Sequence, residues 1–155
     1  MDIAKALGCK IIATTHRESK LALLENADVS ILDDGHLQGK AEADKALDLV
    51  GPKSLLDTLH CVRRGGIVCD TGILGGVYAL DGFDPIKDIP NGVYLTGYFS
   101  NYPDQGSVDS IFRFIRENDL HPSYAMRFGF NDIREACIAL DEGNANRKIV
   151  VVMDQ

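Results

Sequence analysis

The sequence predicts an α/β fold built around a doubly wound parallel sheet, and three observations support this prediction. Short apolar runs rich in β-branched residues lie at residues 10–15, 28–32 and 67–72, which is typical of strands covered on both faces. Segments with apolar residues at helical spacing separate several of these runs. Strands that alternate with helices in this way are joined by right-handed crossovers, and their sheet is therefore parallel.

The first part of the chain has the pattern of a helix end followed by a strand, a helix and a second strand. Residues 1–8 form the helix end, and Gly8 suits the left-handed position that follows a helix. The first predicted strand leads into a helical pattern at residues 18–26, and the second strand comes directly after it.

A further strand and helix are expected in the middle of the chain. The strand is expected to end at Gly51, and the helix to begin at Pro52, because the N–H that proline lacks has no partner in the first helical turn. Arg63 and Arg64 suit the negative end of the helix dipole. We expect Gly65 to end this helix before the next apolar strand begins.

The pattern changes after residue 72. Residues 73–92 form a long loop rich in glycine and proline, and loops of this length inside compact domains are usually functional. The remaining expected elements are a strand at 93–99, a helix capped by Ser107, a strand at 124–130, a helix from Asn131 to Gly143 and a strand at 148–153.

The composition excludes several classes of protein. With 155 residues, 45% hydrophobic and 25% charged, the chain suffices for one ordinary globular domain. A net charge of −7 argues against a nucleic-acid-binding surface and against a polybasic membrane patch. No apolar run is long enough to span a bilayer, and the first residues lack the apolar core of a signal peptide. We therefore expect a cytoplasmic protein with no nucleic-acid or membrane partner.

No metal site is expected in this chain. Cys9, Cys61, Cys69 and Cys137 form no C-x-x-C pair, and most of them lie in or beside apolar stretches. We interpret them as buried, reduced thiols, which is the usual state of cysteine in the cytoplasm. The histidines do not fall at the spacings of zinc ligands.

Hydroxyl groups and cations follow the first predicted strand. A cofactor in a doubly wound fold lies across the carboxyl ends of the strands, and an Asp or Glu after this strand would suit the ribose of NAD. The sequence instead offers hydroxyls and cations, which suit the 2′-phosphate of NADP; they are Thr14, Thr15, His16, Arg17 and Lys20. The alternative interpretation is that Arg17 and Lys20 are solvated charges at the start of a surface helix.

The glycines of "DTGILGG" do not form a pyrophosphate-binding loop. Such a loop passes directly into a helix whose N-terminus faces the phosphates, whereas "VYALDGFDP" follows here and is a poor helix. Gly72, Gly75 and Gly76 instead leave two interpretations open. The turn lets the backbone approach a nicotinamide ring, or it is a plain turn.

Three stretches carry a resemblance to a known family. They are "DIAKALGCKIIATTHRESKLALL", "LDLVGPKSLLDTLHCVRRGGIVCDTGILGG" and "NRKIVVVM". Together they resemble the medium-chain dehydrogenase/reductase superfamily, and within it the quinone oxidoreductase and zinc-type alcohol dehydrogenase-like branch. Members carry a catalytic domain first, then a first strand with a glycine-rich turn. The resemblance implies a truncated Rossmann-like sheet in which that strand and turn are absent, leaving a gap between the strands at 10–15 and 46–50.

The resemblance also implies which residues border an NAD(P) cofactor, with NADP expected rather than NAD. The residues are Thr14, Thr15, Arg17 and Lys20 at the 2′-phosphate, Leu49, Val50 and Gly51 at the ribose, and Thr71, Gly72, Ile73, Leu74, Tyr98, Phe99 and Ser100 at the nicotinamide. No residue stands out as a general acid or base, so no catalytic residue is assigned. Arg17 lies one place from its usual family position, and the acidic Asp33 follows the strand at 28–32, where it would weaken binding of a 2′-phosphate.

The same resemblance suggests the organisation of the molecule. Residues 1–120 are expected to form a partial NAD(P)-binding domain, and residues 121–155 a helix and strand that return to the catalytic domain in the family. A homodimer is expected through the apolar strand from Gly92 to Phe99, which has no charge or internal proline to protect an exposed edge. The alternative is an edge covered by the long loop of the same chain.

Three functions remain open from the sequence. The first is an NADPH-dependent oxidoreductase that transfers hydride to a carbonyl, enone or quinone, with this chain as its cofactor-side part. The second is a non-catalytic truncated module that folds and self-associates. The third is a residual NADP-binding or sensing domain, and the missing pyrophosphate loop argues against it.

Overall fold

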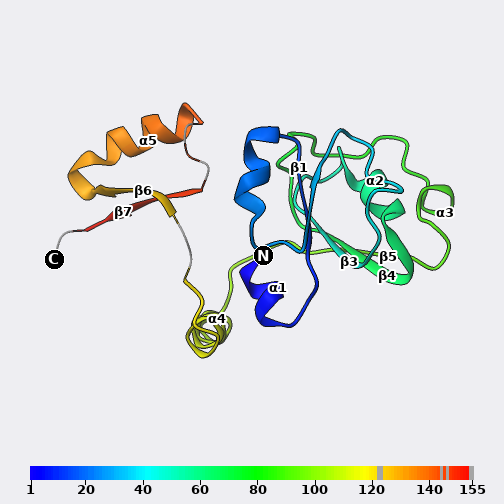
Figure 1. Cartoon of the computed structure of the whole chain (residues 1–155), viewed down its shortest axis with the longest axis horizontal. Helices are drawn as coiled ribbons and strands as arrows, with labels where there is room; N and C mark the ends of the chain where they lie inside the picture. Colours follow the sequence, from blue (N-terminus) through cyan, green and yellow to red (C-terminus); the bar gives the residue numbers. More distant parts are fainter. Residues whose placement is uncertain (122–123, 144, 146, 154–155) are drawn as a thin grey trace. The chain divides into compact units, whose positions relative to one another are not determined.

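The computed structural model describes residues 1–121, 124–143, 145 and 147–153, so the Asn146 of the "NRKIVVVM" stretch lies outside the described residues. The chain is α/β, and the strand pairs of the described residues are all parallel. It divides into two compact units, Met1–Val108 and Asp109–Gln155, and the division falls inside helix α4 (Gln105–Glu117) (Figure 1). Among the described residues, no helix is both long and apolar enough to cross a membrane.

The first unit contains two separate parallel sheets. One pairs β1 (Ile12–Thr15) with β2 (Val29–Leu32), and η1 (Glu18–Leu24), a 3₁₀ helix, joins them. The other has the order β3-β4-β5. Its bounds, with those of the helices around it, are β3 (Ala43–Asp48), α2 (Leu55–His60), β4 (Val62–Asp70), α3 (Pro85–Asp88), β5 (Tyr94–Gly97) and, at the N-terminus, α1 (Asp2–Ala6).

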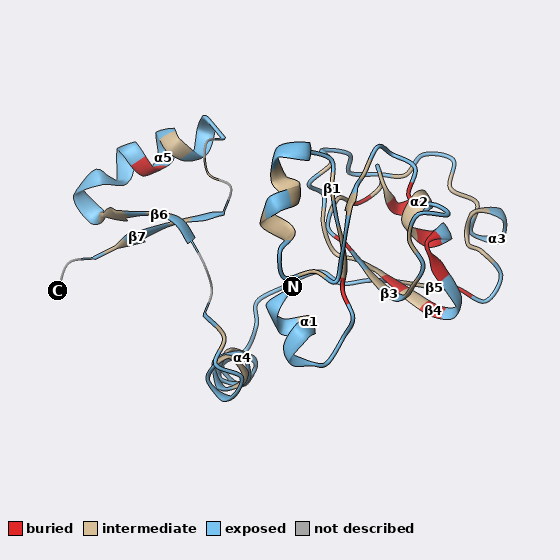
Figure 2. Ribbon diagram, in the orientation of Figure 1, coloured by how far each residue is buried: buried red, intermediate tan, exposed pale blue. Residues whose placement is uncertain are grey.

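The core of this unit lies between α2 and the three-stranded sheet. Leu59 and Val68 are fully buried, and Leu55, Val62 and Val93 pack around them. Figure 2 shows these buried residues gathered on α2, β4 and the start of β5. This core fixes the carboxyl ends of β3, β4 and β5 relative to one another.

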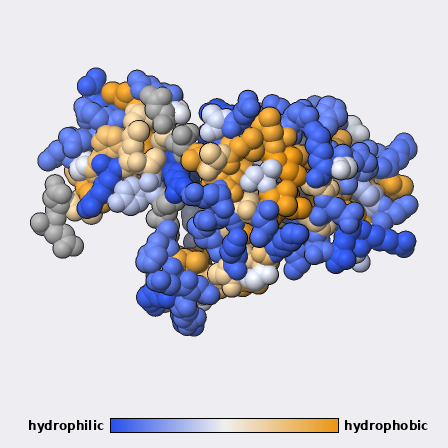
Figure 3. Space-filling view, in the orientation of Figure 1, coloured by the Kyte–Doolittle hydropathy of each residue, from blue (hydrophilic) through white to orange (hydrophobic). Residues whose placement is uncertain are grey.

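The two sheets are not hydrogen-bonded to each other. In the described chain, β1 pairs only with β2, and β3 pairs only with β4, so each has one unpaired edge. The predicted gap between the strands at 10–15 and 46–50 is therefore present. Figure 3 shows hydrophobic residues gathered over β1 on the face toward the viewer.

Several predicted element boundaries were wrong. Strand β3 ends at Asp48, and α2 begins at Leu55 after Ser54 rather than at Pro52. Helix α2 also ends early, because Val62 joins the core as the first residue of β4. Arg63 therefore does not lie in a helix; the segment 63–66 leaves the register of β4 opposite Asp44.

The second unit contains a parallel pair and a helix. Strands β6 (Tyr124–Gly129) and β7 (Lys148–Val152) pair in parallel, and α5 (Ile133–Asp141) connects them after the short 3₁₀ helix η2 (Phe130–Asp132). The predicted strands and helix are confirmed, although the helix begins after Asp132 rather than Asn131. For α4, the predicted cap was also wrong: Ser107 lies inside the helix, and its N–H donates to Asp104 Oδ1 at 2.7 Å.

Candidate functional site

A tight turn follows β3 at the predicted ribose side of the site. Asp48, the last residue of β3, accepts hydrogen bonds from the N–H groups of Val50 (2.8 Å) and Gly51 (2.9 Å) through Oδ1. Gly51 has a φ of +85°, a left-handed conformation that favours glycine. Leu49 is half-exposed at the tip of the turn, whereas Gly51 is buried.

The loop after β4 lies directly on this turn. The N–H of Leu74 donates to the Leu49 carbonyl at 3.1 Å, and the N–H of Gly75 donates to the Val50 carbonyl at 2.9 Å. Gly72 crosses the backbone of Leu49 so closely that a Cβ atom there would overlap it. Gly72 thus allows the backbones of two loops to cross in contact. Ile73 and Leu74, which follow it, are exposed at the surface.

The segment after β5 is joined to the same loop. Thr71 Oγ1 donates to the Tyr98 carbonyl at 2.7 Å, and the Tyr98 N–H donates to the Asp70 carbonyl at 2.9 Å. The side chains of Tyr98 and Phe99 are largely exposed, and Ser100 is exposed as well. The structure therefore joins the three segments that carry the ten residues predicted after these strands, although Phe99 and Ser100 make no hydrogen bond to the other two segments among the described residues.

The remaining predicted residues form a second group after β1. Arg17 N–H donates to Thr15 Oγ1 at 3.3 Å, and Lys20 N–H donates to the Arg17 carbonyl at 2.9 Å. Within the described chain, neither cation forms an ion pair. Asp33 lies beside Thr15, since its N–H donates to the Thr15 carbonyl at 2.8 Å. Its carboxylate, however, accepts the Gly35 N–H within its own turn at 2.8 Å.

Two acidic residues that were not predicted lie at the base of the site. Asp48 and Asp70 are in register across β3 and β4, so their side chains project from the same face of the sheet. Burial raises the pKa of Asp70, the neighbouring charge of Asp48 raises it further, and a hydrogen bond from the Gly72 N–H opposes both effects. Asp70 Oδ1 is buried and has no hydrogen-bond partner among the described residues.

A sequence signal for this pair does exist. "ALDLVG" and "IVCDTG" each place an Asp directly after an apolar run, and parallel pairing brings equivalent positions together. Asp48 is 4% exposed, so the pair belongs to the framework beneath the site rather than to its surface.

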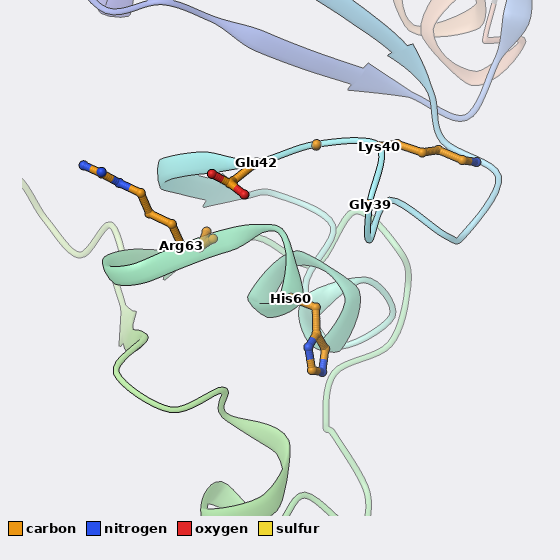
Figure 4. Close-up of a pocket in the computed structure, with 7 residues that line it drawn as sticks. Gly39, Lys40, Glu42, His60 and Arg63 are labelled. Carbon is orange, nitrogen blue, oxygen red and sulfur yellow. The ribbon is translucent and has the colours of Figure 1, made fainter.

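A polar pocket lies at the opposite ends of β3 and β4. It encloses about 310 Å³ and is lined by Gly39, Lys40, Ala41, Glu42, His60, Val62 and Arg63. Lys40 pairs with Asp34 at 2.7 Å, and Arg63 pairs with Asp44. The side chains of Lys40, His60 and Arg63 point in different directions rather than toward one point (Figure 4). The pocket contains none of the predicted site residues.

Comparison with known proteins assigns the chain to a family. The family model described as zinc-binding dehydrogenase matches residues 25–151. The chain belongs to the zinc-binding dehydrogenase family. This membership confirms the resemblance to the medium-chain dehydrogenase/reductase superfamily that the sequence indicated. No curated protein matches this chain at a significant level.

Solved structures share the fold of this chain. AibC matches with a TM-score of 0.82 and 20% identity, over 99% of this chain and 45% of that chain. A quinone oxidoreductase from Pseudomonas syringae pv. Tomato DC3000 matches with a TM-score of 0.69 and 21% identity, over 97% and 51%. E. coli K-12 YhdH with bound NADPH matches with a TM-score of 0.70 and 19% identity, over 97% and 49%. The chain thus spans about half the length of these proteins and has their Rossmann-like fold.

The described part of this chain does not fit a zinc ion. No three His, Cys, Asp or Glu side chains among the described residues come together as metal ligands. Cys61 is buried, and burial raises the pKa of its thiol to about 11, which opposes the thiolate that zinc requires. Cys9 and Cys137 are exposed, so the prediction that the cysteines are buried was wrong for these two.

Proposed function

We propose that this chain is the cofactor-side part of an NADPH-dependent oxidoreductase that transfers hydride to a carbonyl, enone or quinone. The observation that supports this most strongly is the hydrogen-bonded convergence of three loops at the carboxyl ends of β3, β4 and β5. Cofactors of doubly wound folds bind at this edge. The nicotinamide cofactor would supply the hydride, and the protein positions it and excludes water.

In this proposal the three loops bind the nicotinamide half of the cofactor. The exposed side chains of Leu49, Ile73 and Leu74 offer apolar surface for the ring, and the backbone of the turn after β3 borders the ribose. Tyr98 and Phe99 extend the apolar surface from β5. The described chain lacks a glycine-rich turn that opens a helix, so the pyrophosphate must be bound by another segment.

Selectivity for NADPH rests on Arg17 and Lys20. Both follow β1, at the adenosine end of a cofactor bound across the sheet, and neither has an acidic partner among the described residues. The Asp33 carboxylate accepts the Gly35 N–H within its own turn, and no ion pair of the described residues joins it to either cation. Charge-assisted hydrogen bonds to a phosphate are among the strongest that proteins make.

The test is the double substitution Arg17→Ala/Lys20→Ala in the native protein, with affinities for NADPH and NADH measured by cofactor fluorescence. Each charge-assisted contact contributes about 1.5–3 kcal/mol, so we expect the NADPH dissociation constant to rise more than about tenfold while that for NADH is unchanged. The matched control is Lys40→Ala/Arg63→Ala, which removes two cations from the polar pocket and should change neither affinity. Unchanged NADPH affinity in the first variant would contradict the role of these cations.

The alternative function is a module that folds and self-associates without turnover. The open edges of β1, β3 and β5 favour it, because unpaired strand edges are ready to pair with another chain. The two functions differ in one measurement. The oxidoreductase oxidises NADPH when a quinone or enone is supplied, whereas the module associates but leaves NADPH unchanged.

A further inference from the structure

Asp48 is a buried carboxylate with a complete set of hydrogen-bond donors and no cation. Oδ1 accepts from the N–H groups of Val50 and Gly51, and Thr58 Oγ1 donates to Oδ2 at 2.7 Å. Ser54 Oγ lies 2.9–3.0 Å from both carboxylate oxygens. No ion pair of the described residues includes Asp48. Burying a carboxyl group to 4% exposure is costly unless hydrogen bonds replace its lost hydration, and here four residues supply them.

These hydrogen bonds fix the turn at the ribose side of the site. Two of them engage successive backbone N–H groups, and the other three engage the hydroxyls of Ser54, just before α2, and of Thr58, within α2. The turn residues Leu49–Gly51 are thereby tied both to the end of β3 and to the helix that anchors the core. The side chain of Asp48 itself points into this framework and away from solvent.

The turn 49–51 also holds the loop after β4. The carbonyl of Asp48 accepts the Thr71 N–H at 3.0 Å, and the carbonyls of Leu49 and Val50 accept N–H groups of Leu74 and Gly75. Every carbonyl from residue 48 to residue 50 is therefore used by the neighbouring loop. A displacement of the turn would move residues 71–75 with it, because no side chain lies between the crossing backbones at Gly72.

We infer that Asp48 is a positioning residue of the proposed cofactor site: it holds the turn 49–51 and, through that turn, the loop 71–75, without touching the cofactor. The inference rests on the proposed function for its consequence in binding. The coupling of the two loops is a property of the free protein and is testable without any cofactor.

Asp48→Ala and Asp48→Asn separate hydrogen bonding from charge. Alanine removes the acceptor of two N–H groups and of the Thr58 hydroxyl, and leaves the Ser54 hydroxyl only the Gly51 carbonyl at 3.3 Å. The asparagine carboxamide still accepts from the N–H groups, and its NH₂ donates to hydroxyls that are able to reverse their roles. Asp57→Ala is the matched control, since Asp57 accepts the N–H groups of Leu37 (2.6 Å) and Gln38 (3.2 Å) in a loop that contains no predicted site residue.

The first readout is amide hydrogen exchange in the free protein. Asp48→Ala should speed exchange both at residues 49–51 and at residues 71–75, Asp48→Asn should not, and Asp57→Ala should speed exchange at residues 37–38 but not in the two site loops. If the Asp48→Ala protein does not fold, Ser54→Ala/Thr58→Val removes the hydroxyl donors and should speed exchange in the same two segments. An effect confined to 49–51, or the same in the Asp57 control, would overturn the inference.

The second readout is NADPH affinity in the native protein. The dissociation constant should rise about tenfold or more in Asp48→Ala, and by less than about threefold in Asp48→Asn and Asp57→Ala. If the wild-type protein binds neither NADPH nor NADH, the proposed function fails, while the exchange result still decides the coupling of the loops. If it binds NADPH and Asp48→Ala binds equally well, Asp48 has no positioning role.

Discussion

Asp48 and Asp70 end neighbouring strands, and their carboxyl groups have unequal surroundings. Asp48 has donors for both oxygens, whereas Asp70 Oδ1 is buried without one. A buried charge without donors is costly, and proteins relieve that cost by protonation. Burial and the charge of Asp48 raise the pKa of Asp70, which favours its uncharged form.

The raised pKa predicts how stability depends on pH. Because the folded state binds the Asp70 proton more tightly than the unfolded state, the stability from this group is present at pH below its ordinary pKa of 3.8 and is lost as pH rises through the raised value. Asp70→Asn cannot ionise and escapes this loss. We expect the urea midpoint of the variant, relative to that of the wild type, to be higher at about pH 8 than at about pH 4. A difference that is the same at both pH values would contradict the assignment.

The sequence predicted the exposed part of the site better than its support. The loops after Thr15, Val50 and Asp70 were identified because carboxyl ends of parallel strands are where ligands bind. The carboxyl groups of Asp48 and Asp70 were not identified from the sequence. An Asp at the end of a strand gives the same sequence pattern whether its side chain is buried or solvated. Only the register of β3 with β4 brings the two together.

At the scale of elements, the crossing of two loops depends on Gly72. A Cβ at this position would overlap the Leu49 backbone, which cannot rotate away as a side chain can. Gly72→Ala should therefore lower the free energy of unfolding by about 1–3 kcal/mol, as overpacking does, and weaken NADPH binding. Gly97→Ala is the control, since its nearest neighbour would be the Asp70 carbonyl oxygen at an ordinary 3.8 Å. Chemical denaturation of both variants tests this, and equal stabilities would show that the crossing tolerates a side chain.

The open edge of β5 leads to a prediction about association. We propose that two copies pair in an antiparallel manner through Gly92 to Phe99. The Tyr98 N–H points toward β4, and N–H direction alternates along a strand, so the Leu95 N–H, three residues away, points toward the open edge. Leu95→Pro removes that donor, while Leu95→Ala keeps it and loses comparable side-chain packing.

Sedimentation at micromolar concentration tests this pairing. The wild type and Leu95→Ala should be dimers, and folded Leu95→Pro should be a monomer. If the wild type is a monomer, the pairing is wrong; if Leu95→Pro remains a dimer, the interface lies elsewhere.

The strands and helices themselves were largely predictable from the sequence. The apolar runs at β1, β2, β4, β5 and β7 are short and contain β-branched residues, and their pattern does not also predict a helix. The boundary between α2 and β4 was not predictable in this way. Val62 follows Leu55 and Leu59 at helical spacing, which predicts that it continues α2. In the structure Val62 is buried in the core as the first residue of β4, so tertiary packing overrides the local pattern.

At the scale of the whole molecule, the two sheets of the first unit have strand edges without hydrogen-bond partners. β1 and β3 each have an unpaired edge in the described chain, and Ile3, Leu7 and Leu47 expose most of their apolar surface. Unpaired strand edges are ready to pair with a further strand. The chain also spans about half the length of the solved proteins whose fold it shares. We therefore expect tight cofactor binding only in a form of the protein that supplies the pyrophosphate donors.

The central claim is that NADPH binds across the carboxyl ends of the strands. The most direct measurement is hydrogen exchange of the native protein with and without NADPH, read by mass spectrometry. We predict protection at residues 14–20, 49–51, 71–74 and 98–100, and none at the pocket residues 39–42 and 60–63. Protection confined to the pocket, or no protection at saturating NADPH, would contradict the claim.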